Sequence, residues 1–211
     1  MKVFHTASAG LTGPGQLNKK LCFTVNVDGT RNVVDLCLKF NVTRLVYTSS
    51  YNVIFSNKSL ANIDESEPYP SDEDQYDYYS RSKKAAEILL LKYDKTLLRE
   101  HNFISVTYPV RMFLENGETL RCCALRPNAI WGINEQRHLP RIAEKIESGL
   151  TIFKFGSAVV LQDWCNVNNL VQVLIHRPRF LVFQFSYKVL GTFESSRKVI
   201  GLQLYCWWTS L

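Results

Sequence analysis

The segment DGTRNVVDLCLKFNVTRLVYTSS, residues 28–50, places a helix pattern directly before a strand pattern. Apolar side chains recur at helical spacing over residues 16–40, namely Leu17, Leu21, Val25, Val33, Leu36, Cys37 and Phe40. Residues 43–50 form a short apolar run with valine and tyrosine and polar flanks, which is typical of a buried strand. A helix that leads straight into a buried strand indicates an α/β protein.

The same alternation continues on both sides of this segment. Residues 2–8 predict a short first strand, and residues 79–93 predict a second helix with apolar positions spaced by threes and fours. Residues 120–127 predict a third strand that ends in a proline, and residues 140–148 predict a third helix that a glycine closes. The polar, acidic residues 56–77 predict a loop. This alternation predicts a parallel sheet with crossover helices.

Composition and charge are ordinary for a soluble globular protein with one core. The chain has 211 residues, of which 46% are hydrophobic and 21% charged, and its formal net charge is +6. Much of the positive charge lies in residues 176–211, where five basic residues meet one acid. A basic tail attracts nucleic acid or an anionic membrane surface. Because no basic run or nucleic-acid motif accompanies it, a solvated tail is the simpler interpretation.

The six cysteines form no CxxC pair. They predict reduced, buried thiols of an intracellular protein, with no metal site. The first residues, MKVFHTASAG, contain too short an apolar run for a signal peptide. No stretch of the sequence reaches the ~18 apolar residues of a membrane span.

Residues 74–93, DQYDYYSRSKKAAEILLLKY, crowd three tyrosines against two lysines at a helix entry. A tyrosine hydroxyl with a pKa near ~10 is a poor acid or base at neutral pH, unless a nearby lysine stabilises the phenolate and lowers that pKa. Helix positions i and i+4 share a face, and among these tyrosines only Tyr79 has a lysine at that spacing, Lys83. The pair is either an acid/base couple or an ordinary surface pair.

Ser50, at the end of the second strand, favours the acid/base interpretation. Ligands of parallel sheets lie beyond the carboxyl ends of the strands, which here are residues 5–8, 48–50 and 126–127. Reduction of a carbonyl needs a proton donor and a second donor that polarises its oxygen, and Tyr79 with Ser50 supplies both. The helix residue Asn26 either closes a proton relay through water or is an amide on the helix surface.

Five motifs occur in the order and approximate spacing of the extended short-chain dehydrogenase/reductases. They are HTAS (5–8), NVDGT (26–30), LVYTSS (45–50), YSRSK (79–83) and LRPNAIWG (125–132). The chain most resembles the 3-beta-hydroxysteroid dehydrogenase/isomerase branch, particularly its steroid-dehydrogenase-like members. The runs NEQRHLPRI (134–142) and DWCNVNNLVQ (163–172) strengthen that narrower resemblance, which covers roughly residues 1–175.

The resemblance implies a role for each residue of the site. Tyr79 would donate or accept the proton, and Lys83 would lower the Tyr79 pKa and hydrogen-bond the nicotinamide ribose. Ser50 would hold the substrate oxygen, with Ser49 as the neighbour most easily confused with it, and Asn26 would sit in the proton relay. The other implied cofactor contacts are His5 and Ala7 near the adenine-side ribose and diphosphate, and Pro127 and Asn128 beside the nicotinamide.

The reaction that the resemblance implies is hydride transfer between NAD or NADP and a secondary alcohol or ketone of a sterol or steroid. It implies a small-molecule partner and no nucleic acid. It permits a homo-oligomer, an intracellular location in the cytoplasm or at the endoplasmic reticulum, and peripheral association with that membrane.

Members of this family begin with a strand, a glycine-rich turn and a helix that cradle the cofactor diphosphate, whereas this chain starts at about their fourth strand. The expected fold is therefore a partial NAD(P)-binding Rossmann fold without the N-terminal βαβ unit over residues 1–175, followed by a divergent basic tail at 176–211. Residues 10–15, GLTGPG, have the spacing GxxGxG, and Asp35 beyond them lies in a helix pattern. We interpret them as a pocket-edge loop rather than a phosphate loop. Residues 96–119 predict an insertion with its own apolar patch.

Three functions remain open at this point. The first is the NAD(P)-dependent oxidoreductase. The second is a non-catalytic, truncated fragment that retains Ser50, Tyr79 and Lys83, binds no dinucleotide alone, and is unstable or held by a partner. The third is a binding module based on the basic tail. The missing glycine-rich unit favours the second function over the first for the isolated chain.

Overall fold

The computed structural model describes residues 1–56, 60, 63, 67–92, 110–114, 116–150, 161–162, 164–176 and 189–190. The chain divides into two compact units. The first comprises Met1–Pro127 with Gln172–Gln184, and the second comprises Asn128–Val171 with Phe185–Leu211.

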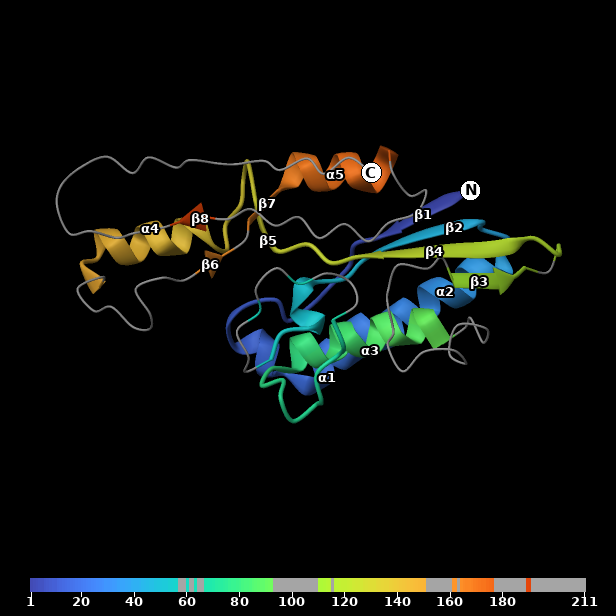
Figure 1. Cartoon of the computed structure of the whole chain (residues 1–211), viewed down its shortest axis with the longest axis horizontal. Helices are drawn as coiled ribbons and strands as arrows, with labels where there is room; N and C mark the ends of the chain where they lie inside the picture. Colours follow the sequence, from blue (N-terminus) through green and yellow to red (C-terminus); the bar gives the residue numbers. More distant parts are fainter. Residues whose placement is uncertain are drawn as a thin grey trace. The chain divides into compact units, whose positions relative to one another are not determined.

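The first unit is built on a four-stranded sheet with the order β1-β2-β4-β3 (Figure 1). β1 (Lys2–His5), β2 (Arg44–Thr48) and β4 (Thr119–Leu125) run parallel, and β3 (Val110–Phe113) pairs antiparallel with β4. Among the described strands, β1 pairs on one side only, with β2. Because β1, β2 and β4 are parallel, their carboxyl ends share one edge of the sheet.

Three helices cover one face of this sheet (Figure 1): α1 (Lys19–Phe23), α2 (Gly29–Lys39) and α3 (Tyr78–Lys92). The strands alternate, so that Leu45 and Tyr47 of β2 face the helices and are buried. The buried core between sheet and helices consists of Val34, Cys37, Val42, Leu45, Tyr47, Ala86, Leu90, Leu114, Leu120, Cys122 and Ala124. This core fixes α3 against the sheet and thereby places the first turns of α3.

The helix predicted over residues 16–40 is confirmed over Lys19–Lys39, where α1, η2 and α2 follow one another directly, but it begins later than predicted and is not regular α-helix throughout. η1 (Gly13–Leu17) is a 3-10 helix, and η2 (Thr24–Asp28) is a π-helix between α1 and α2. The side-chain oxygen of Asn18 accepts a hydrogen bond of 3.0 Å from the Leu21 N–H and thus begins α1 as an N-cap. The wide turn of η2 changes the side-chain register between α1 and α2.

Only part of the apolar pattern of this segment faces inward. Four of its seven positions, Leu17, Leu21, Leu36 and Phe40, are 63%, 41%, 52% and 63% exposed. Cys37 of the pattern is buried, and the other buried positions are Cys22, Asn26, Thr30 and Val34. Two of these are polar, and they are buried because each finds hydrogen-bond partners on the facing elements, which apolar periodicity does not reveal.

Part of the predicted insertion at residues 96–119 forms a hairpin between β3 and β4. The Leu114 N–H donates to the Glu118 carbonyl at 2.8 Å, and Gly117 takes a φ of +80° in the turn. Leu114 and Leu120 are buried in the core of the first unit, and the separate apolar patch of the insertion stays a prediction. Residues 96–109 lie outside the described residues.

The second unit contains two small sheets and one amphipathic helix. β5 (Ala129–Trp131) pairs parallel with β7 (Trp164–Asn166), and β6 (Leu161–Gln162) pairs antiparallel with β8 (Val189–Leu190). α4 (Leu139–Glu147) belongs to this unit. α5 (Val167–His176) runs across the boundary between the units, and the Asn166 side chain caps its first turn by accepting from the Asn168 N–H at 2.9 Å.

The predicted α/β class with a parallel sheet is confirmed. The helices predicted at residues 79–93 and 140–148 correspond to α3 and α4, and the described positions within 56–77 contain no helix or strand. In the described part of the chain, no helix is both long and apolar enough to cross a membrane. The division into residues 1–175 and a tail at 176–211 stays a prediction, because most of that tail lies outside the described residues.

Candidate active site

Tyr79 and Lys83 lie in the first turns of α3. Asp77 precedes the helix, and its carboxylate accepts from the Ser80 N–H and the Ser80 hydroxyl, both at 2.7 Å, which satisfies a free donor of the first turn. Tyr79 is 4% exposed and Lys83 only 1%. The two residues are therefore not an ordinary surface pair.

The Lys83 ammonium reaches the carboxyl end of β2. Its Nζ donates to the Thr48 carbonyl at 2.8 Å and lies 4.7 Å from the centre of the Tyr47 ring. Burial lowers the pKa of Lys83 to about 8, against the opposing charge of Glu87, which raises it. An ammonium carries three N–H donors, and the described residues supply one hydrogen-bond acceptor, so the group retains donors for a ligand.

Ser49 and Ser50 follow β2, and the structure gives them different partners. The Ser49 hydroxyl donates to the carboxylate of Glu87 on α3. The Ser50 hydroxyl oxygen accepts from the Asn52 N–H at 3.3 Å and caps the short 3-10 helix η3 (Tyr51–Val53). Because Ser50 uses only its oxygen in this contact, its O–H remains a donor for a substrate oxygen, whereas the Ser49 proton is already engaged.

Asn26 lies in η2 and is 1% exposed, so it is not an amide on the helix surface. Its side chain forms a two-way clamp with the backbone of Ala9, accepting from the N–H and donating to the carbonyl, each at 2.9 Å. Asn26 Nδ2 also donates to the Ser82 hydroxyl at 2.9 Å, and that hydroxyl donates to the Tyr79 carbonyl at 2.8 Å. Asn26 thus connects the loop after β1 to the α3 turn that carries Tyr79. Its part in a proton relay stays a prediction.

His5 ends β1 and is held by Thr30 of α2. The Thr30 hydroxyl donates to the Asn26 carbonyl at 2.6 Å, so its oxygen accepts from His5 Nε2 at 2.9 Å and the proton is assigned to Nε2. Burial lowers the pKa of His5, and the charge of Lys83 lowers it further. His5 is therefore a neutral imidazole at neutral pH.

The other predicted cofactor contacts are Ala7, Pro127 and Asn128. Ala7 is exposed in the loop after β1. Pro127 is buried beyond β4, and its carbonyl accepts from the Tyr51 N–H at 3.2 Å. Asn128 is buried and begins the second unit. The roles of these three residues toward a cofactor stay predictions.

Gly10 opens the loop of residues 10–15, whose predicted place at a pocket edge stays a prediction. This residue takes a φ of +83°, and a Cβ built on it would lie 2.4 Å from the Cys22 Sγ. Gly10 is therefore required by the close approach of α1 and by its own backbone conformation. The loop leads into the 3-10 helix η1, and Asp35 lies within α2 rather than at a strand end. Neither feature is typical of a phosphate loop.

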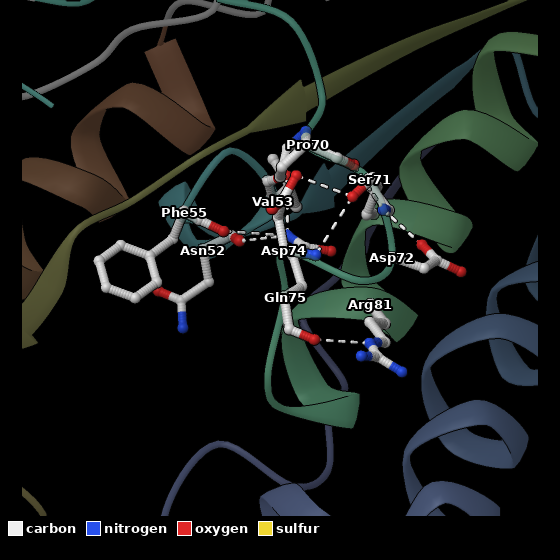
Figure 2. Close-up of polar contacts among 10 residues, drawn as sticks. Asn52, Val53, Phe55, Pro70, Ser71, Asp72, Asp74, Gln75 and Arg81 are labelled. Atoms are coloured by element: carbon white, nitrogen blue, oxygen red, sulfur yellow. Dashed lines mark hydrogen bonds and ion pairs between the residues drawn. The ribbon is translucent and has the colours of Figure 1, made fainter. Parts of the chain in front are cut away.

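Gln75 is a site residue that the sequence interpretation missed. Its Nε2 lies 3.0, 3.1 and 3.4 Å from the backbone carbonyls of Asn52, Val53 and Phe55, as Figure 2 shows. The Gln75 carbonyl in turn accepts from Arg81 Nε of α3 at 2.7 Å (Figure 2). Gln75 therefore fastens η3, which Ser50 caps, to the entry of α3. No sequence motif marks it, since a buried glutamine in a polar loop has no periodicity.

Glu87 and Arg126 are a second omission. Both are buried, and Arg126 Nη2 lies 2.8 Å from Glu87 Oε1. Glu87 follows Lys83 by one helical turn, so the spacing that selected Tyr79 and Lys83 also points to Glu87 when continued. Among the described residues, no group of three or more metal-ligating side chains gathers, and the five described cysteines form no disulfide.

Comparison with known proteins identifies the relatives of this arrangement. The family model described as "3-beta hydroxysteroid dehydrogenase/isomerase family" matches residues 1–189. The chain belongs to this family. The resemblance predicted from the five motifs is confirmed.

Two curated relatives illustrate the match to the 3-beta hydroxysteroid dehydrogenase/isomerase family. Short-chain dehydrogenase/reductase family 42E member 1 of Homo sapiens is 44% identical over 174 residues, which are 82% of this chain and 40% of that protein. The decarboxylating sterol-4-alpha-carboxylate 3-dehydrogenase of Schizosaccharomyces pombe is 34% identical over 167 residues, 79% of this chain and 41% of that protein. The chain thus spans less than half the length of these relatives.

Solved structures agree on the fold. The dTDP-glucose 4,6-dehydratase of Bacillus anthracis, in complex with NAD, matches this chain with a TM-score of 0.60 at 19% identity. The match covers 88% of this chain and 51% of the dehydratase chain. A UDP-galactose 4-epimerase matches with a TM-score of 0.55 at 19% identity, and the match covers 82% of this chain and 48% of the epimerase chain. These likenesses show the predicted Rossmann-like α/β fold.

Proposed function

We propose that this chain carries the proton-transfer half of an NAD(P)-dependent oxidoreductase that interconverts a secondary alcohol and a ketone. The observation that supports this most is the burial of Tyr79 and Lys83 on one face of α3, with Lys83 bonded to the Thr48 carbonyl beside Ser50. An acid/base residue, a cation and a hydroxyl donor are the groups that carbonyl reduction needs from the protein.

Each residue has a defined task in this proposal. Tyr79 gives its phenolic proton to the substrate oxygen during reduction and takes it back during oxidation. Lys83 stabilises the phenolate and thereby lowers the Tyr79 pKa. Ser50 donates its O–H to the same substrate oxygen, and η3 and Gln75 hold Ser50 in place. Asn26 orients Tyr79 through Ser82 and the α3 backbone.

The nicotinamide cofactor, when bound, supplies or accepts the hydride. The donors that Lys83 retains fit the ribose hydroxyls of such a cofactor, and Tyr79 lies one turn before it on the same helix. The other residues of the first unit that we propose for the cofactor site are His5, Ala7 and Pro127. The NAD bound in the structural relatives supports NAD as the first cofactor to test, with NADP beside it.

The proposed substrate is a sterol or steroid with a secondary hydroxyl group. The relatives named for sterol-4-alpha-carboxylate and for 3-beta-hydroxysteroids act on this class by their names. These relatives are 34% and 32% identical to this chain, and the matched region includes Ser50, Tyr79 and Lys83. We extend the substrate class to this chain on that basis.

A non-catalytic fragment is the second candidate. It is favoured by the packing role of Gly10 and by the 3-10 helix that follows, since neither offers a helix N-terminus to a diphosphate. In this case Ser50, Tyr79 and Lys83 are retained without dinucleotide binding. The third candidate, a module based on the basic tail, falls on residues outside the described part of the chain.

Self-association is part of the proposal. Leu17, Leu21, Leu36 and Phe40 expose large apolar side chains on the helical segment from η1 to α2. Exposed large apolar side chains favour burial against another protein surface. A second copy of this chain is the occupant we propose.

Calorimetric titration of NAD and NADP, in both redox states, into the purified chain tests the function after a thermal melt has shown cooperative unfolding. Micromolar binding that weakens in Lys83→Ala supports the oxidoreductase. A folded chain that binds none of the four dinucleotides supports the fragment instead. The exposed Tyr76, replaced in Tyr76→Phe, serves as a control for changes at the entry to α3, because it is 74% exposed.

A further inference from the structure

The carboxylate of Glu87 is the centre of a buried polar network. Glu87 is fully buried, and its Oε1 accepts from Arg126 Nε at 3.0 Å, from Arg126 Nη2 at 2.8 Å and from the Tyr69 hydroxyl at 2.6 Å. Its Oε2 accepts from the Ser49 hydroxyl. A buried charge with this many donors is fully satisfied, which makes the network rigid and its geometry specific.

The donors come from separate parts of the first unit. Ser49 follows β2, Arg126 follows β4, and Tyr69 lies in the loop before α3. Glu87 itself lies on α3, in the turn after Lys83. One carboxylate therefore ties the carboxyl ends of two parallel strands to the helix that carries the proposed acid/base pair. Both strand ends lead directly into site residues, Ser50 after Ser49 and Pro127 after Arg126.

Glu87 is also the nearest source of negative charge on the face of α3 that carries Lys83. The titratable groups around the Lys83 ammonium are His5 from β1, Tyr47 from β2, and Tyr79 and Glu87 from α3 itself. Among the buried residues that the structure describes, Glu87 is the only carboxylate. Among the described residues, Lys83 forms no ion pair of its own, so the Glu87 charge acts on it at a distance along the helix.

We propose that Glu87 is a positioning residue for the reaction proposed above: it fixes Ser49 and Arg126 at the strand ends, and its charge holds Lys83 as an ammonium. This inference rests on the proposed function for its catalytic consequence. The electrostatic and geometric effects exist without a cofactor and are measured without one. A purely structural ion pair would stabilise the fold and leave the titration of Lys83 unchanged.

The first variant is Glu87→Gln. The amide has the shape of the carboxylate, its oxygen still accepts from Arg126 and Tyr69, and its NH₂ group donates to the Ser49 oxygen. Only the charge is lost. Two controls match it: Tyr69→Phe removes a hydrogen bond from the same carboxylate, and Asp72→Asn removes a carboxylate that pairs with Lys84 on the same helix.

The measurement is an NMR titration of the purified chain with lysine labelled at Cε and Nζ, with the Lys83 signal assigned by its loss in Lys83→Met. We expect a Lys83 midpoint near the value of about 8 in the unaltered chain. In Glu87→Gln this midpoint falls by about one pH unit, because an attractive charge is gone. The two controls keep the midpoint of the unaltered chain. A folded Glu87→Gln chain with an unchanged midpoint overturns the electrostatic part of the proposal.

The geometric part has its own variant, Ser49→Ala, which keeps the Glu87 charge. The Ser49 N–H donates to the Leu125 carbonyl at 2.7 Å, and the Tyr51 N–H donates to the Pro127 carbonyl at 3.2 Å. These two hydrogen bonds connect the carboxyl ends of β2 and β4. If Glu87 positions the strand ends through Ser49, hydrogen exchange at these two amides should be faster in Ser49→Ala than in the unaltered chain. In Tyr69→Phe the exchange rates should stay unchanged. Equal exchange in both variants overturns this part, even where Glu87→Gln does not fold.

These outcomes are separate from those of the proposed function. A lowered Lys83 midpoint in a chain that binds no dinucleotide supports the role of Glu87 and contradicts the oxidoreductase. If the chain turns over substrate, the limb of its pH profile of kcat/KM that reports Lys83 should shift in Glu87→Gln. The shift should go to lower pH, as the NMR midpoint of Lys83 does. Turnover that falls without any shift of the pH profile contradicts the positioning role and leaves the oxidoreductase standing.

Discussion

The Lys83 ammonium donates a hydrogen bond of 2.8 Å to the Thr48 carbonyl, which joins α3 to the last residue of β2. This bond compensates only part of the cost of burying the charge, since burial lowers the pKa of Lys83 to about 8 from an ordinary value of 10.5. Between these two values the unfolded chain binds more protons than the folded chain. The unfolding free energy contributed by Lys83 therefore rises with pH across this window.

The corresponding measurement is urea unfolding of the unaltered chain and of Lys83→Met at several pH values from 7.5 to about 10.5. As the pH rises across this range, the unfolding free energy of the unaltered chain should increase by about 3 kcal/mol relative to that of the variant. This total follows from about 1.36 kcal/mol for each pH unit between the Lys83 pKa of the folded chain and that of the unfolded chain. A stability difference that is constant with pH contradicts the lowered pKa. Taking the difference between the two chains removes the titration of the buried cysteines from the comparison.

Tyr79→Phe should abolish turnover of a steroid alcohol while leaving dinucleotide affinity nearly unchanged, because only the transferable proton is lost. A loss of about 10²-fold or more is the scale of general acid–base catalysis. Initial rates and calorimetric affinities check the two statements separately. Tyr76→Phe removes a hydroxyl from the same helix entry and should keep full activity, so equal losses in the two variants would sink the assignment.

Gln75→Met should destabilise the first unit by about 1–2 kcal/mol through loss of the hydrogen bonds to the η3 carbonyls. Part of the loss is offset, because the Gln75 Oε1 is buried without a hydrogen-bond partner among the described residues and disappears in the variant. Chemical unfolding measures the change. Ser71→Ala removes two exposed hydrogen bonds to Asp74 in the same loop and should cost about 0.5 kcal/mol or less.

Gly10→Ala should destabilise the chain more than Gly13→Ala does. Both glycines have positive φ values, +83° and +67°, so both substitutions carry backbone strain. Only at position 10 would the new Cβ also meet the Cys22 Sγ, whereas nothing lies within 4 Å at position 13. Thermal melts of both variants and of Gly10→Ala/Cys22→Ala measure the clash, which the double variant relieves. Equal losses at the two glycines would show that packing on Cys22 is unimportant.

Replacing Phe40 by glutamate should reduce self-association. Phe40 is 63% exposed at the end of α2, so its removal costs little folding stability but places a charge in the proposed contact. Size-exclusion chromatography with light scattering, run over a range of concentrations, gives the mass. Arg31→Glu changes the charge of the same helix at a polar position and serves as the control. A chain that is monomeric without any substitution contradicts the proposal directly.

The sequence revealed the strands and the pair Tyr79 and Lys83 because each depends on local pattern. A buried strand needs a short apolar run, and two residues on one helix face need only the right spacing. The sequence predicted the helical segment before β2 but not that Asn26 and Thr30 face inward from it. Their burial depends on partners such as His5 and Ser82, which are distant in the chain and chemically unremarkable until the fold brings them together.

Glu87 and Gln75 escaped notice for a related reason. Each is a polar residue whose partners come from other elements, so its importance lies in tertiary hydrogen bonds rather than in its own neighbourhood. The confirmed family explains the motifs that surround the site. It does not by itself assign a role to either residue.

The π-helix at η2 has a consequence for how this protein can change in evolution. Its wide turn holds one residue more than an α-helical turn does. Deletion of a single residue there would be absorbed as the wide turn returns to the tighter α-helical turn, so the helical segments on either side keep their rotation relative to one another. Deletion of one residue within α2 would instead rotate everything that follows by about 100°. A change in length is therefore tolerated more readily at η2 than within α2, and η2 is the place where the length of this segment can vary in evolution.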